Sequence, residues 1–74
     1  MIPLSQVNIG RFKIVAILTP GVFQRLRNMG IFIGDIIEVV KPAPGPVIFK
    51  KGNIRVGIGT GMAFKIMVIP VKEK

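Results

Sequence analysis

Apolar residues recur at every second position along most of this chain, and this alternation restricts the fold more than any other feature. Within residues 11–18, the even positions from Phe12 to Leu18 are apolar and fall on one face of an extended segment. Val15 and Ile17 make the other face apolar as well, so we expect both faces to be covered near the end of this segment. The same pattern predicts five strands, over residues 11–18, 36–41, 47–51, 54–58 and 65–69.

Turn residues separate the predicted strands. Residues 42–46 read PAPGP, and Gly52-Asn53 lies between two basic, alternating segments, which predicts a tight hairpin. Closure into a barrel would hide the edges of such apolar strands. We therefore expect a mainly β fold, a small five-stranded barrel that forms a single domain over residues 1–74.

The period changes in residues 19–30, which read TPGVFQRLRNMG. Thr19 can cap a helix whose first position is Pro20, and Gly30 can end it in the left-handed conformation. We expect this short helix near residues 22–29 to follow the first strand and to fill one open end of the barrel. Four apolar residues fall on one face at helical spacing: Val22, Phe23, Leu26 and Met29.

Two or three helical turns are not stable alone in water, so this helix has to dock on the barrel. We expect Leu26 and Met29 to hold it there. Docking through these residues leaves Gln24, Arg25 and Arg27 on the outward face, where they can contact a partner. The two arginines lie about 200° apart around the axis, so they cannot grip one carboxylate together.

Few residues of this chain can carry chemistry. It has no cysteine and no histidine, which removes disulfides, thiol chemistry and zinc-type sites. The chain has three acidic residues, and two of them, Asp35 and Glu38, project to opposite faces of a predicted strand. We therefore expect neither a metal site nor a catalytic pair of carboxylates. The glycines of residues 57–61, GIGTG, indicate a bend and a single helical turn rather than a phosphate loop. We expect no enzymatic activity and no cofactor.

Charge favours an acidic partner. The chain has 11 lysines and arginines against three acids, a formal net charge of +8, although the cations are scattered. A solvated surface and a specific basic site are both open interpretations. Nucleic acid would need aromatic platforms, and Phe49 is a candidate that is more often a core residue. The first residues do not resemble a signal peptide, and no apolar run is long enough to span a membrane, so we expect a cytoplasmic protein.

A series of short motifs runs through the chain almost from end to end. In order they are Leu4-Ser5 and Gly10, Arg25-Leu26, Met29-Gly30 and Gly34, Ala43-Pro44 and Gly45-Pro46-Val47, and Ala63, Ile66 and Val68. Their order and spacing resemble the FeoA family, the small cytoplasmic ferrous iron transport protein A. Leu26, Met29, Gly30 and Gly34 would be the structural residues of this motif.

The resemblance implies an SH3-like barrel without enzymatic activity or cofactor. It also implies a partner, the cytosolic part of FeoB, a membrane-embedded ferrous iron transporter that the barrel would assist and modulate. We expect Gln24, Arg25 and Arg27 to contact this partner, and the basic surface to contact the anionic inner membrane surface. The alternative is a small basic barrel that binds nucleic acid, and for this chain we expect such binding to be weak and independent of base sequence.

Overall fold

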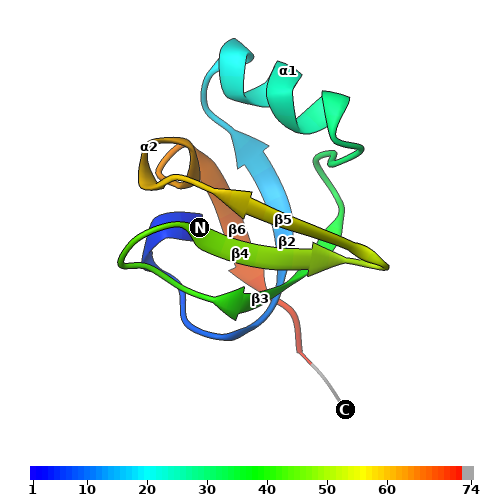
Figure 1. Ribbon diagram of the computed structural model, residues 1–74. Helices are drawn as coiled ribbons and strands as arrows, with labels where there is room; N and C mark the ends of the chain where they lie inside the picture. Colours follow the sequence, from blue (N-terminus) through cyan, green and yellow to red (C-terminus); the bar gives the residue numbers. More distant parts are fainter. Residues whose placement is uncertain (73–74) are drawn as a thin grey trace.

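The computed structural model describes residues 1–72 and shows a mainly β fold with one helix longer than a single turn (Figure 1). The predicted mainly β class, with a short helix after the first long strand, is confirmed. In chain order the elements are β1 (Ile2–Pro3), a 3-10 turn η1 (Leu4–Gln6), β2 (Gly10–Ile17), α1 (Pro20–Asn28), β3 (Ile36–Lys41), β4 (Val47–Lys51), β5 (Ile54–Ile58), α2 (Thr60–Ala63) and β6 (Ile66–Pro70).

The strands form one antiparallel sheet in the order β1-β6-β2-β3-β4-β5. The sheet bends strongly, so that β3, β4 and β5 cross in front of β2 and β6 and α1 lies beyond one end (Figure 1). Its ladder of hydrogen bonds stays open between β1 and β5. The two-residue strand β1 was not predicted, because two residues are too short to show a period.

Three predicted strands, residues 36–41, 47–51 and 54–58, have the observed bounds, and the other two are shifted by one residue. One detail of the first strand was wrong. A register shift between Ile14 and Ala16 marks a β-bulge, after which the alternation changes phase. Ile17 therefore packs against the core, whereas Leu18, expected on the covered face, is 58% exposed.

The core lies between the two halves of the bent sheet and is apolar. Its largest fully buried side chain is Phe49, which confirms the core interpretation of this residue and removes it as a stacking platform. Phe12 also faces the core, as the alternation predicts. The core draws on every strand except β1, on both helices, on η1 and its C-cap, and on the segment after α1. Its residues are Leu4, Val7, Phe12, Ile14, Leu26, Ile31, Ile37, Val39, Val47, Phe49, Val56, Ile58, Ala63, Ile66 and Val68.

Two turns fix the strands around the core. The tight hairpin at Gly52-Asn53 is confirmed, and it pairs Lys51 with Ile54. The proline-rich turn of residues 42–46 is organised by a lysine at its start. The ammonium of Lys41 donates to the carbonyl oxygens of three prolines, at 3.3, 3.0 and 3.1 Å: Pro42, Pro44 and Pro46.

Candidate functional site

Helix α1 begins and ends where the sequence predicts. The hydroxyl of Thr19 accepts a hydrogen bond from the Val22 N–H at 3.4 Å, and Pro20 occupies the first turn. Arg25 and Arg27 lie in the last turn, where positive charge complements the helix dipole. Gly30 then adopts a φ of +81°, which confirms the left-handed ending.

The two sides of α1 differ in the way the sequence predicts, with two exceptions on the apolar face, Phe23 and Met29. Leu26 is completely buried and Val22 packs partly against the core, whereas Gln24, Arg25 and Arg27 are exposed. The predicted partner residues are thus accessible, and their role stays a prediction.

Met29 was expected to hold the helix together with Leu26, and this is wrong. It is the C-cap residue, where the chain leaves the helix, and its side chain is 38% exposed. The helix is therefore anchored mainly by Leu26. Met29 is available to a partner instead.

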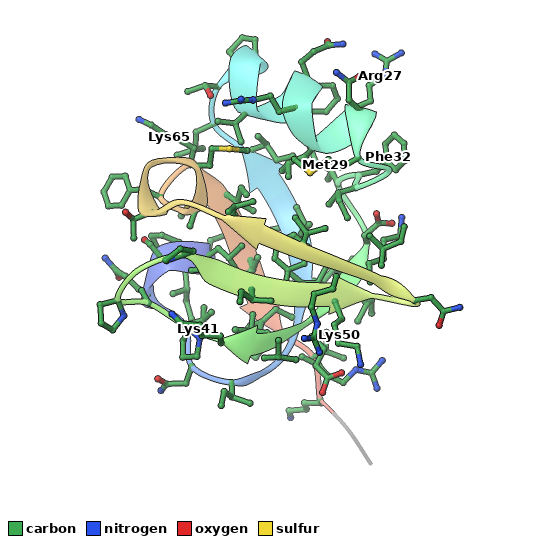
Figure 2. All side chains as sticks on the ribbon, viewed as in Figure 1. Arg27, Met29, Phe32, Lys41, Lys50 and Lys65 are labelled. Carbon is green, nitrogen blue, oxygen red and sulfur yellow. The ribbon has the colours of Figure 1, made fainter. Side chains whose placement is uncertain are left out.

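The guanidinium groups of Arg25 and Arg27 have no hydrogen-bond or ion-pair partner among residues 1–72. Figure 2 shows Arg27 projecting outward from α1, with Met29 and Phe32 nearby. Phe23 lies four residues before Arg27 and therefore on the same flank of the helix. An aromatic ring and a cation are thus presented together.

Large apolar side chains are exposed around α1, and sequence reasoning did not predict their exposure. We call this surface, together with the outward face of α1, the helix end. Phe32 and Ile33 lie in the link between α1 and β3, and Phe64 follows α2. A hydrogen bond from the Leu18 N–H to the Lys65 carbonyl, at 2.8 Å, ties the segment after α2 to the segment before α1. The exposed apolar residues of the helix end are Leu18, Phe23, Met29, Phe32, Ile33 and Phe64.

A signal for part of this surface exists in the sequence. Phe32 and Ile33 lie between Gly30 and Gly34, outside any predicted strand or helix. Apolar residues in a short link are frequently exposed, since such links run over the surface. Gly34 itself has a φ of +100°, and its N–H donates to the Ile14 carbonyl at 2.7 Å, so this motif residue fixes the link to β2.

An ion pair stabilises the corner between α1 and β3. The Lys51 ammonium lies 2.7 Å from Asp35 Oδ2 and donates to the Gly30 carbonyl at 2.6 Å. The same carboxylate oxygen accepts from the Phe32 N–H at 2.8 Å. Burial opposes ionisation, but the hydrogen bonds from Lys51 and Phe32 and the charge of Lys51 outweigh it, so the pKa of Asp35 lies below its usual value.

The Lys51 ammonium offsets the negative charge of Asp35 at this corner. The Lys51 ammonium also lies 5.4 Å from the centroid of the Phe32 ring, and the Lys65 ammonium 6.0 Å from that of Phe64. The helix end therefore presents apolar side chains bordered by cations.

The part of the chain that the structure describes contains no group of three or more His, Cys, Asp or Glu side chains that could hold a metal ion. Within the same residues, no helix is both long and apolar enough to cross a bilayer. The glycine-rich residues 57–61 form the end of β5 and the start of the single-turn helix α2, as predicted.

Known proteins resemble this chain over nearly its whole length. Residues 2–70 match the family model of the FeoA domain. A Methanocaldococcus jannaschii protein that bears the name Fe(2+) transport protein A is 40% identical over 70 residues, which cover 92% of this chain and 85% of that protein.

Two solved structures share the fold. A crystal structure described as an iron uptake regulatory protein (FeoA) has a TM-score of 0.80 at 36% identity, and the match covers 92% of this chain and 93% of that one. The solution structure of a FeoA protein from Chlorobium tepidum has a TM-score of 0.83 at 23% identity, over 96% of this chain and 71% of that one. Because the family match includes every strand and both helices, the chain belongs to the FeoA domain family.

Proposed function

We propose that this protein is a non-enzymatic cytoplasmic accessory of ferrous iron uptake, which docks on the cytosolic part of a FeoB-like transporter and modulates it. Membership of the FeoA domain family supports a role in iron uptake, since the similar proteins are named for iron transport and uptake. The observation that carries the docking proposal is the helix end, where exposed apolar side chains and two unpaired arginines occur on one surface.

The two kinds of side chain have different roles in such docking. Buried apolar and aromatic anchors supply most of the affinity of an interface, and charges at the rim steer the partners together. Phe23, Met29 and Phe32 would be the anchors, and Arg25 and Arg27 the rim. The partner surface that complements them is an apolar patch bordered by acidic residues.

The transporter, and not this protein, would bind the iron ion. The chain has no histidine or cysteine, and its acids include Asp35, whose carboxylate is engaged by Lys51. These residues are unsuited to hold a transition metal ion tightly. The contribution of this protein is therefore contact, not coordination.

Charge reversal tests the docking proposal. In the variant carrying Arg25→Glu and Arg27→Glu, we expect an unchanged melting temperature, because both side chains are exposed and unpaired. Binding to the purified cytosolic part of the transporter, measured by calorimetry, and iron uptake in cells should both be lost. The matched control carries Lys13→Glu and Lys72→Glu, which make the same change in net charge away from α1. If the arginine variant binds within a factor of two of the original protein, the docking site lies elsewhere.

A second experiment tests whether the helix end binds a membrane surface. Cations beside exposed apolar residues also suit an anionic bilayer surface. We expect the protein to associate with vesicles containing anionic lipids only weakly, and to lose this association with added salt. Vesicle binding that survives physiological salt, together with an unchanged affinity of the arginine variant for the transporter, would assign the helix end to the membrane.

Nucleic acid is the alternative partner, and the exposed rings of Phe23, Phe32 and Phe64 are the observation that favours it. Lysines already lie near two of these rings, however, which competes with base stacking. We expect binding of single-stranded RNA or DNA to be weak, independent of sequence and strongly dependent on salt. Submicromolar binding of one sequence near physiological salt would favour nucleic acid over the transporter.

A further inference from the structure

A row of charged side chains crosses the outer face of the sheet, away from the helix end. Directly paired residues of neighbouring strands point to the same face. The strand register therefore places four residues from β2, β3, β4 and β5 side by side, and we call them the charged row: Arg11, Glu38, Lys50 and Arg55. Figure 2 shows Lys50 in a different part of the molecule from Arg27.

Two members of the charged row repel each other. Lys50 and Arg55 are directly opposite on β4 and β5, and like charges in this position destabilise a sheet. Within residues 1–72, neither side chain has an ion-pair partner. A bound anion would offset this repulsion, and the register of β4 and β5 already places the two residues side by side.

A hollow lies beside the row. Its volume is about 480 Å³, within the range of small-molecule sites. Three kinds of surface meet in it: cations, one carboxylate, and the exposed apolar side chain of Ile36. The residues that line it are Arg11, Ile36, Ile37, Glu38, Lys50 and Gly52.

We propose that this hollow binds a nucleoside phosphate. Lys50, which lines the hollow, and Arg55, which is paired with Lys50 at its border, would bind the phosphate groups through charge-assisted hydrogen bonds. Glu38, between Arg11 and Lys50 in the row, can accept hydrogen bonds from the sugar hydroxyls, and Ile36 offers an apolar surface to the base. A nucleotide complements all three surfaces in one molecule, whereas inorganic phosphate complements the cations alone. This site is independent of the docking proposal, since it uses another face of the protein.

The test is an NMR titration of the labelled protein with ADP, pyrophosphate and adenosine at constant ionic strength. We expect saturable shifts of the Ile36, Lys50 and Gly52 amides with ADP, weaker ones with pyrophosphate, and none with adenosine. The variant carrying Lys50→Gln and Arg55→Gln should bind ADP at least about tenfold more weakly, because it loses two charge-assisted hydrogen bonds. It should fold normally, since the substitutions remove a repulsion, and Lys50→Gln alone provides a second variant.

Arg25→Gln with Arg27→Gln removes the same charge at the helix end, and we expect it to bind ADP within about twofold of the original protein. Equal losses in the two double variants would show attraction by net charge and overturn the proposal. Equal binding of adenosine and ADP would overturn the phosphate assignment. An RNA oligonucleotide that shifts the same amides while ADP shifts none would assign the row to a polynucleotide, and that outcome also refutes the proposal.

Discussion

Replacement of Leu26 by alanine should detach the helix end while leaving the strands paired. Leu26 is the residue of α1 that is completely buried, and the neighbouring Val22 is only partly so. Leucine-to-alanine changes at buried sites cost about 2 to 5 kcal/mol, from lost transfer free energy and from the cavity left behind. Because α1 lies at the edge of the molecule and can partly settle into the gap, we expect about 3 kcal/mol.

This loss is large for a chain of 74 residues. Domains of this length have a free energy of unfolding of about 4 to 11 kcal/mol, and each kcal/mol corresponds to about 4 to 8 °C in melting temperature. We therefore expect the melting temperature of Leu26→Ala to fall by about 12 to 24 °C. Urea unfolding followed by circular dichroism gives the free energy, and hydrogen exchange of the α1 amides shows whether the helix opens first.

Met29→Ala is the matched comparison, because sequence reasoning gave Met29 the same anchoring role. Its side chain is 38% exposed, so we expect a cost below about 1 kcal/mol. The same variant should nevertheless weaken docking to the transporter. Equal destabilisation by the two substitutions, or a cost below about 0.5 kcal/mol for Leu26→Ala, would refute the assignment of the anchor to Leu26.

The corner between α1 and β3 and the composition can each be tested. The folded-state pKa of Asp35 is lowered, so its pairing with Lys51 stabilises the fold above about pH 4. This stabilisation disappears as the pH falls through the lowered pKa. In urea titrations at a series of pH values, Asp35→Asn should abolish this part of the pH dependence. Gly30→Ala should cost about 1 to 2 kcal/mol, measured the same way, because φ is +81° although space for the methyl group is open. Anaerobic calorimetry with ferrous iron should show no stoichiometric binding in the micromolar range, since histidine and cysteine are absent.

The parts of the fold that could be predicted from sequence are those set by local chemistry. Alternating apolar residues predict three strands with the observed bounds, because side chains of a half-buried strand have a period of two. Thr19 and Pro20 predict the start of α1 and Gly30 its end, since capping depends on single residues and their conformations.

The features that could not be predicted depend on contacts between residues that are far apart in the sequence. The bulge in β2 shifts the register of its pairing with β6, and Leu18 is exposed although the local pattern places this residue inside. The pairing of Lys51 with Asp35 joins the end of β4 to the link before β3, which spacing along the chain cannot reveal. The outward face of α1 could be predicted, whereas the exposure of Phe23 could not, because a ring at helical spacing is equally typical of a core.

The open ladder has a consequence for how copies of this protein meet. In the part of the chain that the structure describes, β5 is an edge strand of the sheet, and an edge strand can add a strand from another molecule. Arg55 lies on this strand, and each copy carries a formal net charge of +8, so two edges that approach each other bring like charges together. The surplus of cations therefore also opposes aggregation of this protein through the exposed edge, and neutralising Arg55 would weaken that protection.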